Sequence, residues 1–207
     1  MKIPIRITCS NCKRDQYVSV HLNELRFEAT CECGKDLSGV LAGFTTGDKL
    51  IRRSLFEYHD NSDYALCVVF AAMAMECELS RLFIKWSRID SLGGSWPTDH
   101  ELEGSLRKFS NIAARIDEVA RLMYPAGFTS FVQSQTEIKQ MIIDGFNRLD
   151  VNDLPSSFQK QLFWPRNRIL HLGDAMIKEG EARYCFNTAT LGLRILDLLD
   201  QHRRAAG

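Results

Sequence analysis

The larger, C-terminal part of the chain carries apolar residues at the spacing of one helix face. From about residue 61 to the end they recur every three or four positions, which is typical of amphipathic helices. Segment 64–75 is apolar on all sides, so the helix expected over 62–89 should be the centre of a bundle. Further helices are expected over 99–123, 129–146, 177–202 and from about Ser156. The pattern predicts a mainly α protein, an up-and-down bundle of four or five helices.

Proline and glycine residues separate the expected helices. Segments 91–97 and 150–155 and the pair Pro125 and Gly127 have the composition of turns. Pro165 falls inside the fourth helix and is expected to kink it or to begin its second half. Gly173 is expected to end that helix, because glycine readily adopts the left-handed conformation of a helix C-cap.

Residues 1–43 follow a different pattern, in which apolar and other residues alternate. The alternation is clearest at Ile3, Ile5 and Ile7 and indicates a β-strand. Segments 17–20 and 26–29 are further short strand candidates. The chain is therefore expected to divide into a small β zinc ribbon at 1–43, a linker at 44–60 that enters a short helical piece, and the helical bundle at 61–207.

Four of the seven cysteines form two close pairs, which a β-like stretch separates: Cys9, Cys12, Cys31 and Cys33. In a chain that begins without the apolar core of a signal peptide, such pairs favour metal ligation by reduced thiols over disulfides. They predict a closed tetrahedral site for one structural zinc ion, with no open position for catalysis. Gly34 follows the second pair, where a tight turn favours a residue without Cβ. That pair has a single intervening residue, so His21 remains an alternative ligand.

Composition and charge narrow the classes of partner. With 207 residues and a hydrophobic fraction of 45%, the chain is long enough to bury a core. Twenty-six Lys and Arg residues balance 26 Asp and Glu residues, so any contact with RNA must be local. The longest apolar run, 64–75, is shorter than the roughly 18 residues that cross a bilayer. These features predict a cytoplasmic protein without a membrane contact.

The segment 164–171 carries the candidate chemistry. It places Arg166, Asn167 and His171 within two expected helical turns. An arginine forks onto phosphate oxygens, and a histidine transfers protons near neutral pH, so the group suggests chemistry on a phosphodiester. Glu76 or Glu78 could orient Arg166, although pairing within their own helix is the alternative. The competing interpretation of the whole segment is a helix start with one histidine satisfied in the core.

The arginine, the polar residue after it and the histidine resemble the R-x4-6-H signature of the HEPN superfamily of helical ribonucleases and nucleotide-binding proteins. Segment 158–200 resembles the C-terminal half of such a domain, because a glycine and a long Ala- and Leu-rich helix follow the signature. The resemblance implies a homodimer in which two signature segments face each other across a cleft. It also implies RNA as a partner, cut without a metal ion or bound without cutting. A role in defence or in a toxin–antitoxin system, with an antitoxin or other regulatory protein as partner, is a further implication.

The chemistry assigns a role to each residue. RNA carries its own nucleophile, the 2′-OH, so a metal-independent endoribonuclease needs only proton transfer and charge stabilisation. His171 would act as general acid or base, Arg166 would neutralise phosphate oxygens, and Asn167 would hold a phosphate or the histidine. On a regular helix Arg166 and His171 point about 140° apart. A two-fold dimer that buries 164–171 would close the site, and Arg168 is the alternative cation.

Two other functions fit the same residues. In the first, the protein is a non-catalytic module in which the arginine and histidine hold a nucleotide or an RNA end. In the second, it is an interaction protein whose ribbon docks a partner and whose bundle only dimerises.

Overall fold

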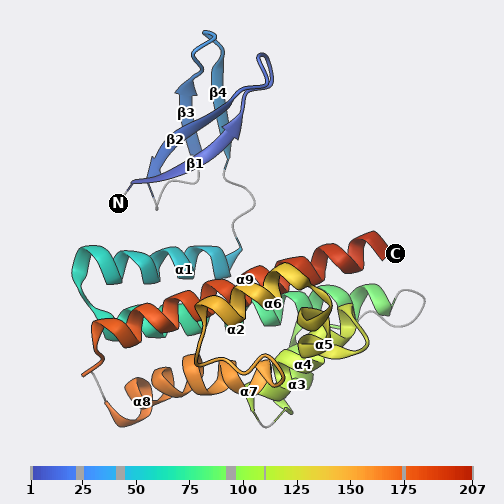
Figure 1. Cartoon of the computed structure of the whole chain (residues 1–207). Coiled ribbons are helices and arrows are strands. Elements are labelled where there is room, and N and C mark those ends of the chain that lie inside the picture. Colours follow the sequence, from blue (N-terminus) through green and yellow to red (C-terminus); the bar gives the residue numbers. More distant parts are fainter. Residues whose placement is uncertain are drawn as a thin grey trace. The chain divides into compact units, whose positions relative to one another are not determined.

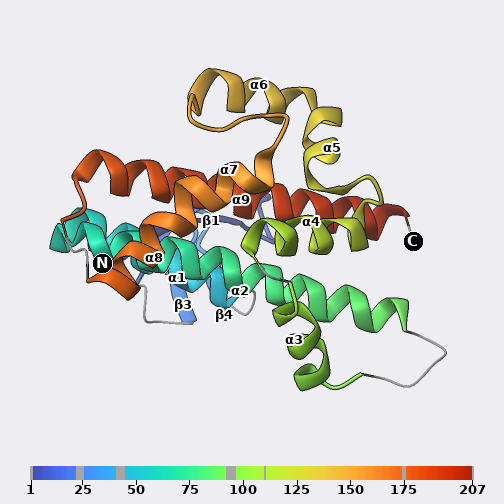
Figure 2. The ribbon, with the colours of Figure 1, turned by 90° about the horizontal axis from the view of Figure 1, so that it is seen from below.

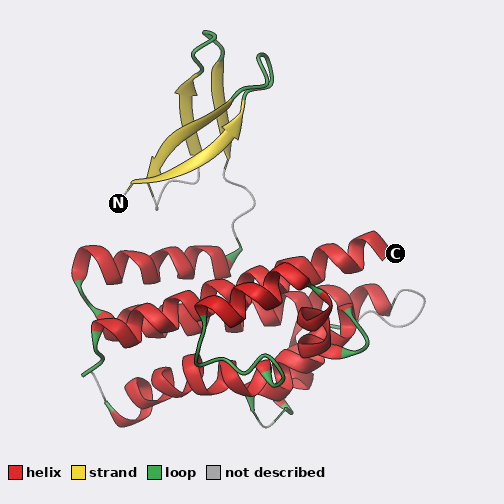
Figure 3. Cartoon of the chain, in the orientation of Figure 1, coloured by secondary structure: helices red, strands yellow, loops and turns green. Residues whose placement is uncertain are grey.

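The computed structural model describes residues 2–21, 26–40, 45–91, 97–109, 111–173 and 176–206. The chain forms two compact units, Met1–Thr45 and Thr46–Gly207. In the described residues, strands occur in the first unit and helices in the second (Figure 3). The protein is therefore mainly α with a small β part, as the sequence pattern predicts.

The N-terminal unit consists of two antiparallel hairpins. Strands β1 (Lys2–Thr8) and β2 (Asp15–His21) pair from Lys2 with His21 to Thr8 with Asp15. Strands β3 (Arg26–Thr30) and β4 (Asp36–Val40) pair from Arg26 with Val40 to Thr30 with Asp36. The first three strands include the segments predicted from the sequence, whereas β4 was not predicted. Each hairpin has a short loop that carries one cysteine pair.

The helical unit is built around α2 (Tyr64–Asp90), as the apolar segment predicts. Its buried residues run from Cys67 to Trp86. Helix α9 (Glu179–Ala206) and helix α1 (Thr46–Phe56) both pack along it (Figure 1). Asp63 caps α2 by accepting a hydrogen bond from the Leu66 amide at 2.9 Å, which agrees with the predicted helix start.

The segment predicted as a linker, 44–60, contains helix α1 and most of the π-helical turn η1 (Glu57–Asn61). Both belong to the helical unit. Ser54 on α1 is buried and donates a hydrogen bond to the Cys67 carbonyl of α2 at 2.7 Å. This helix therefore contributes to the bundle, and the boundary between the units lies at Thr45.

Two predicted helices are each divided in the structure. The segment 99–123 forms α3 (Asp99–Arg107) and α4 (Ile112–Met123), because Asn111 is extended and caps α4 through the Ala114 amide. The segment 129–146 forms α5 (Gly127–Ser134) and α6 (Thr136–Gly145), with extended backbone at Gln135 between them. Helical periodicity continues through both breaks, so the pattern alone does not reveal them.

The fourth predicted helix is continuous from Leu154 to Leu172, with a π-helical turn inside it. It comprises α7 (Leu154–Phe158), η2 (Gln159–Phe163) and α8 (Trp164–Leu172), and Gly173 ends it at φ 66°. Pro165 has no N–H for the carbonyl of Gln161, four residues earlier. The buried Cys185 thiol of α9 donates to that carbonyl at 3.1 Å instead. Burial raises the pKa of Cys185 to about 12, so the thiol keeps the proton that this contact needs.

No helix within the described residues has both the length and the apolar character needed to cross a membrane.

Candidate functional site

Helix α8 carries the three residues singled out from the sequence. It is a regular α-helix over Trp164–Leu172 and packs against α2 (Figure 2). The π-helical turn η2 lies before Trp164. Because this turn lies outside the segment 166–171, Arg166 and His171 point in the directions that a regular helix gives them.

Arg166 is held on the side of α8 that faces α2. Its Nη2 donates to Glu76 Oε2 of α2 at 3.1 Å, and its Nη1 donates to Asn167 Oδ1 at 2.9 Å. The side chain is 22% exposed. Its Nε is buried and makes no hydrogen bond with any described residue. The guanidinium is thus oriented, and Glu76 neutralises much of its charge.

His171 lies on a different side of α8. Its side chain is exposed, and no described residue forms a hydrogen bond or an ion pair with its imidazole. The regular helix separates it from Arg166 by about 140°. One chain therefore brings Arg166 and Asn167 together but does not bring His171 to them. The interpretation of His171 as a buried core histidine is wrong.

The face of α8 that carries His171 also carries Trp164 and Arg168, at i, i+4 and i+7. Arg168 Nη1 lies 3.3 Å from Glu181 Oε1 of α9. Beside this pair is a pocket with a cavity volume of about 110 Å³, lined mainly by basic and aromatic side chains. Its principal lining residues are Arg148, Lys160, Trp164, Arg168, Glu181 and Tyr184.

Sequence reasoning missed most of this pocket. Arg148 and Tyr184 are 36 residues apart, and their contact has no counterpart in any local spacing. A basic residue in a turn, such as Arg148, and an aromatic residue on a helix, such as Tyr184, are common on the surface of a helical bundle, so neither gave a signal.

Apolar side chains are exposed at the end of α8 and just after it. Leu170, Leu172 and Met176 are 51%, 78% and 87% exposed, and Trp164 at the start of the helix is 66% exposed. Leu170 and Leu172 point about 160° apart on the helix, so they do not form one continuous surface. Each is a candidate for burial against a partner.

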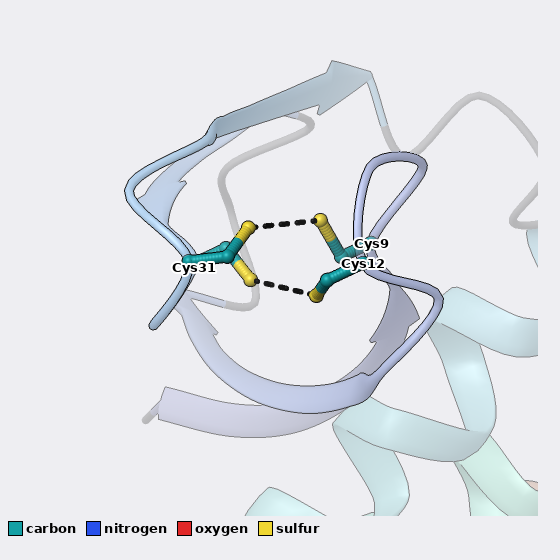
Figure 4. Close-up of side chains that lie close together, drawn as sticks. Cys9, Cys12 and Cys31 are labelled. Atoms are coloured by element: carbon teal, nitrogen blue, oxygen red, sulfur yellow. Dashed lines mark hydrogen bonds between the residues drawn. The ribbon is translucent and has the colours of Figure 1, made fainter.

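The four predicted metal ligands come together between the two hairpin loops of the N-terminal unit. Figure 4 shows Cys9, Cys12 and Cys31 of this cluster. The Sγ atoms of Cys9, Cys12, Cys31 and Cys33 all lie within 4.8 Å of one another. Cys9 lies 3.8 Å from Cys33, and Cys12 lies 3.6 Å from Cys31. Four thiolates around a tetrahedral zinc ion at the usual bond length are about 3.8 Å apart. The four thiols could therefore hold a metal ion of this kind.

Both loops reach this geometry through left-handed backbone. Gly34 follows Cys33 at φ 81°, and its amide donates to the Cys31 carbonyl at 2.8 Å. Lys13 follows Cys12 at φ 60°, and its amide donates to the Cys9 carbonyl at 2.9 Å. The prediction for Gly34 is confirmed, since its backbone occupies the region that favours glycine.

Hydrogen bonds and burial give the thiols of Cys31 and Cys33 different pKa values. The side-chain amide of Asn11 donates to Cys33 at 3.6 Å and is the largest cause that lowers the pKa of this thiol to about 6. The backbone N–H of Cys33 acts to lower the pKa of Cys31. Burial and the neighbouring thiols outweigh it, and the pKa of Cys31 rises to about 12. Cys33 thus offers a thiolate near neutral pH before any metal ion binds.

His21, the alternative ligand, ends β2 opposite Lys2, and its side chain lies outside the described part of the structure. The four thiols lie within 4.8 Å of one another without it.

Comparisons of the chain with models of protein families, with curated proteins and with solved structures found no match. The resemblance to the HEPN superfamily therefore rests on the residues of segment 158–200.

Proposed function

We propose that the protein is a metal-independent endoribonuclease that cleaves RNA through its 2′-OH. The observation that carries the proposal is the exposed imidazole of His171, which has no partner among the described residues. A structural histidine is usually buried against a hydrogen-bond partner, whereas a general acid or base needs access to its substrate. The arginine and carboxamide of the signature, Arg166 and Asn167, lie on the same helix.

The reaction is a transesterification within the RNA strand. The 2′-oxygen loses its proton and forms a bond to phosphorus, while the bond from phosphorus to the 5′-oxygen breaks. His171 takes the proton of the 2′-OH as a general base, or gives a proton to the leaving 5′-oxygen as a general acid. Solvent water completes the other proton transfer. Arg166 stabilises the added negative charge on the phosphate oxygens. Asn167, which accepts a hydrogen bond from Arg166 at 2.9 Å, keeps the guanidinium in place.

A second copy of the chain would complete this site. Arg166 and His171 diverge on one helix, but a two-fold axis beside α8 can set the His171 of one chain opposite the Arg166 of the other. Leu172 and Met176 would contribute to the contact, since burying them would remove two largely exposed side chains from water. Trp164, at the other end of α8, would remain at the edge of the cleft.

The four cysteines that could hold a metal ion belong to the N-terminal unit, and we propose that they bind one. We propose that it is zinc, because four thiolates in a tetrahedral set are a characteristic zinc site. With four protein ligands the site has no open position for substrate. Its role is therefore to hold two hairpins together that lack a sufficient core of their own.

A digest of RNA in chelator tests the proposal. Wild type should cut RNA and leave DNA whole, and the products should end in a 2′,3′-cyclic phosphate or a 3′-phosphate. His171→Ala should lower the rate by on the order of 10²–10⁴-fold. His59→Ala is the matched control, because His59 is another exposed histidine of the helical unit, in η1. Products that end in 5′-phosphate would contradict the proposal, as would an unchanged rate in His171→Ala.

The dimer is tested separately by light scattering at micromolar concentration. Leu172→Glu should shift the protein from dimer to monomer and reduce cleavage. Ile143→Glu changes an apolar residue of α6 that is 53% exposed, and it should do neither. A wild-type protein that is monomeric and fully active would contradict this part of the proposal.

One observation favours a second function, a non-catalytic module that binds RNA or a nucleotide. The Arg166 guanidinium is engaged by Glu76 at 3.1 Å and faces away from His171. In that case RNA would bind without being cut, and His171→Ala would weaken binding without changing any product. A defence or toxin–antitoxin role, with a regulatory protein as partner, is the biological setting that the resemblance to the HEPN superfamily supports for either function.

A further inference from the structure

The pocket beside Arg168 has an unusual combination of side chains for its size. Its cavity volume is about 110 Å³, well below the roughly 300 Å³ at which sites for drug-sized ligands begin. It can nevertheless hold several waters and therefore a small anion. The pocket thus has room for a single phosphate group and not for a whole nucleotide.

The charge of the lining favours an anion. Arg148, Lys160 and Arg168 contribute three positive charges, and Glu181 contributes one negative charge. Glu181 lies 3.3 Å from Arg168, so Arg148 and Lys160 are the cations that lack a carboxylate partner among the described residues. A lining with a surplus of two positive charges matches the charge of a phosphate group.

Arg148 is held in position without using the donors of its guanidinium group. Its guanidinium carbon lies 4.8 Å from the centroid of the Tyr184 ring, and its backbone amide donates to the Tyr184 hydroxyl at 3.2 Å. Stacking on an aromatic face leaves the N–H groups at the edge of the guanidinium plane free to donate. No described residue accepts a hydrogen bond from this guanidinium. The arrangement supplies a pre-oriented fork for phosphate oxygens.

Trp164 gives the pocket an aromatic rim. Its ring is 66% exposed, and it lies on the same face of α8 as His171, about 10 Å away along the helix axis. An exposed aromatic ring beside a basic pocket is the arrangement on which single-stranded nucleic acid stacks its bases. A short strand could therefore place one phosphate in the pocket and continue along α8 to His171.

We propose that this pocket is a phosphate subsite for single-stranded RNA, with Arg148 and Lys160 as the phosphate ligands and Trp164 as the platform for the adjacent base. The inference rests on the proposed function, since it assigns to that site the path of its substrate. Arg168 lies between the subsite and His171 on α8 and stays paired with Glu181.

The test uses a fluorescent 2′-O-methyl RNA oligonucleotide, which has no free 2′-OH and is not cleaved. Affinity is measured over a range of salt concentrations for wild type, Arg148→Gln and Lys160→Gln. The slope of log K against log salt is negative. Each variant should make it shallower by about 0.7, the value for one phosphate contact to a single strand. Trp164→Leu should weaken binding on the order of tenfold at every salt concentration. Lys108→Gln is the control, because Lys108 is an exposed cation of the helical unit that does not line the pocket.

The outcomes separate this inference from the nuclease proposal. Wild-type slopes in both Arg148→Gln and Lys160→Gln, or no binding of RNA by the wild type, would overturn the subsite. Shallower salt slopes in Arg148→Gln and Lys160→Gln would support the subsite. If His171→Ala at the same time cleaves RNA at the wild-type rate, only the nuclease proposal is overturned. Repeating the titration with a 5′-phosphorylated oligonucleotide identifies the source of the phosphate. Tighter binding indicates a strand end, and equal binding indicates an internal phosphate.

Discussion

Arg166 of α8 and Glu76 of α2 form an ion pair at 3.1 Å across the contact between the two helices. Of the two glutamates that the sequence offered, Glu76 reaches Arg166, whereas Glu78 pairs with Arg81 on its own helix at 2.5 Å. The Arg166 pair is partly exposed, so its contribution to stability is modest. Its main effect is on orientation, since it fixes which side of α8 the guanidinium occupies.

Replacing Glu76 with Gln tests whether that orientation matters. The variant should fold, with a loss of about 1 kcal/mol or less in the free energy of unfolding. RNA cleavage should fall by more than this loss of stability explains, because Arg166 is no longer held. Glu78→Gln is the comparison on the same helix, and we expect it to affect stability without a selective loss of cleavage. If Glu76→Gln cleaves RNA as fast as the wild type, Glu76 does not orient Arg166 for cleavage. Urea titration and the RNA digest provide the two measurements.

Replacing each arginine of α8 tests which cation acts on the phosphate. Arg166→Ala should lower the cleavage rate on the order of 10²-fold or more, as expected for the loss of an electrostatic stabiliser. Arg166→Lys should recover little of it, because an ammonium group cannot replace the planar fork. Arg168→Ala should have a much smaller effect. If Arg168→Ala abolishes cleavage and Arg166→Ala does not, the signature has been assigned two residues too early.

Removal of the metal ion should affect one unit and spare the other. We expect one zinc ion per chain by elemental analysis. Stripping it should abolish the β structure of 1–45 and leave the helical signal in circular dichroism, since the two units are separately compact. Cys33→Ser should lower the zinc content, whereas Cys77→Ser, which changes a half-buried cysteine of α2, should not. Loss of zinc in His21→Ala with retention in Cys33→Ser would show that the histidine is the fourth ligand.

Asp200 should give the helical unit a defined acid dependence. Its carboxylate is fully buried and accepts hydrogen bonds from Lys85 at 2.6 Å, Trp86 at 2.8 Å and Arg204. Burial acts to raise its pKa, but these hydrogen bonds outweigh burial and hold the pKa below its ordinary value. A folded-state pKa below the unfolded one stabilises the protein above about pH 4, and this stabilisation is lost as pH falls through the folded value.

The substitution Asp200→Asn should therefore lower the free energy of unfolding at pH 7 by on the order of 2–3 kcal/mol. The difference from wild type should stay constant down to about pH 4 and shrink at lower pH. Asp197→Asn, an exposed position on the same helix, should change stability by less than about 0.5 kcal/mol. Urea titrations at a series of pH values provide the measurement, and a pH-independent difference down to pH 2 would refute the assignment.

Local patterns in the sequence determined much of this protein. Helical spacing identified the central helix and α9, alternation identified three strands, and the two close cysteine pairs identified four thiols that could hold a metal ion. These features are local because each depends on residues a few positions apart, and the helix, the strand and the tight turn have fixed periods. The same locality explains the errors, since the breaks at Asn111 and Gln135 do not interrupt the apolar period.

Only the tertiary structure decided how the residues of α8 are used. The sequence placed Arg166, Asn167 and His171 within six residues of one another. Packing against α2 then drew Arg166 to Glu76, 90 positions away, and left His171 exposed. The pocket likewise depends on Arg148, Lys160 and Tyr184, which come from separate segments. Such contacts are set by how helices pack, and no spacing along the chain encodes the neighbour across a helix interface.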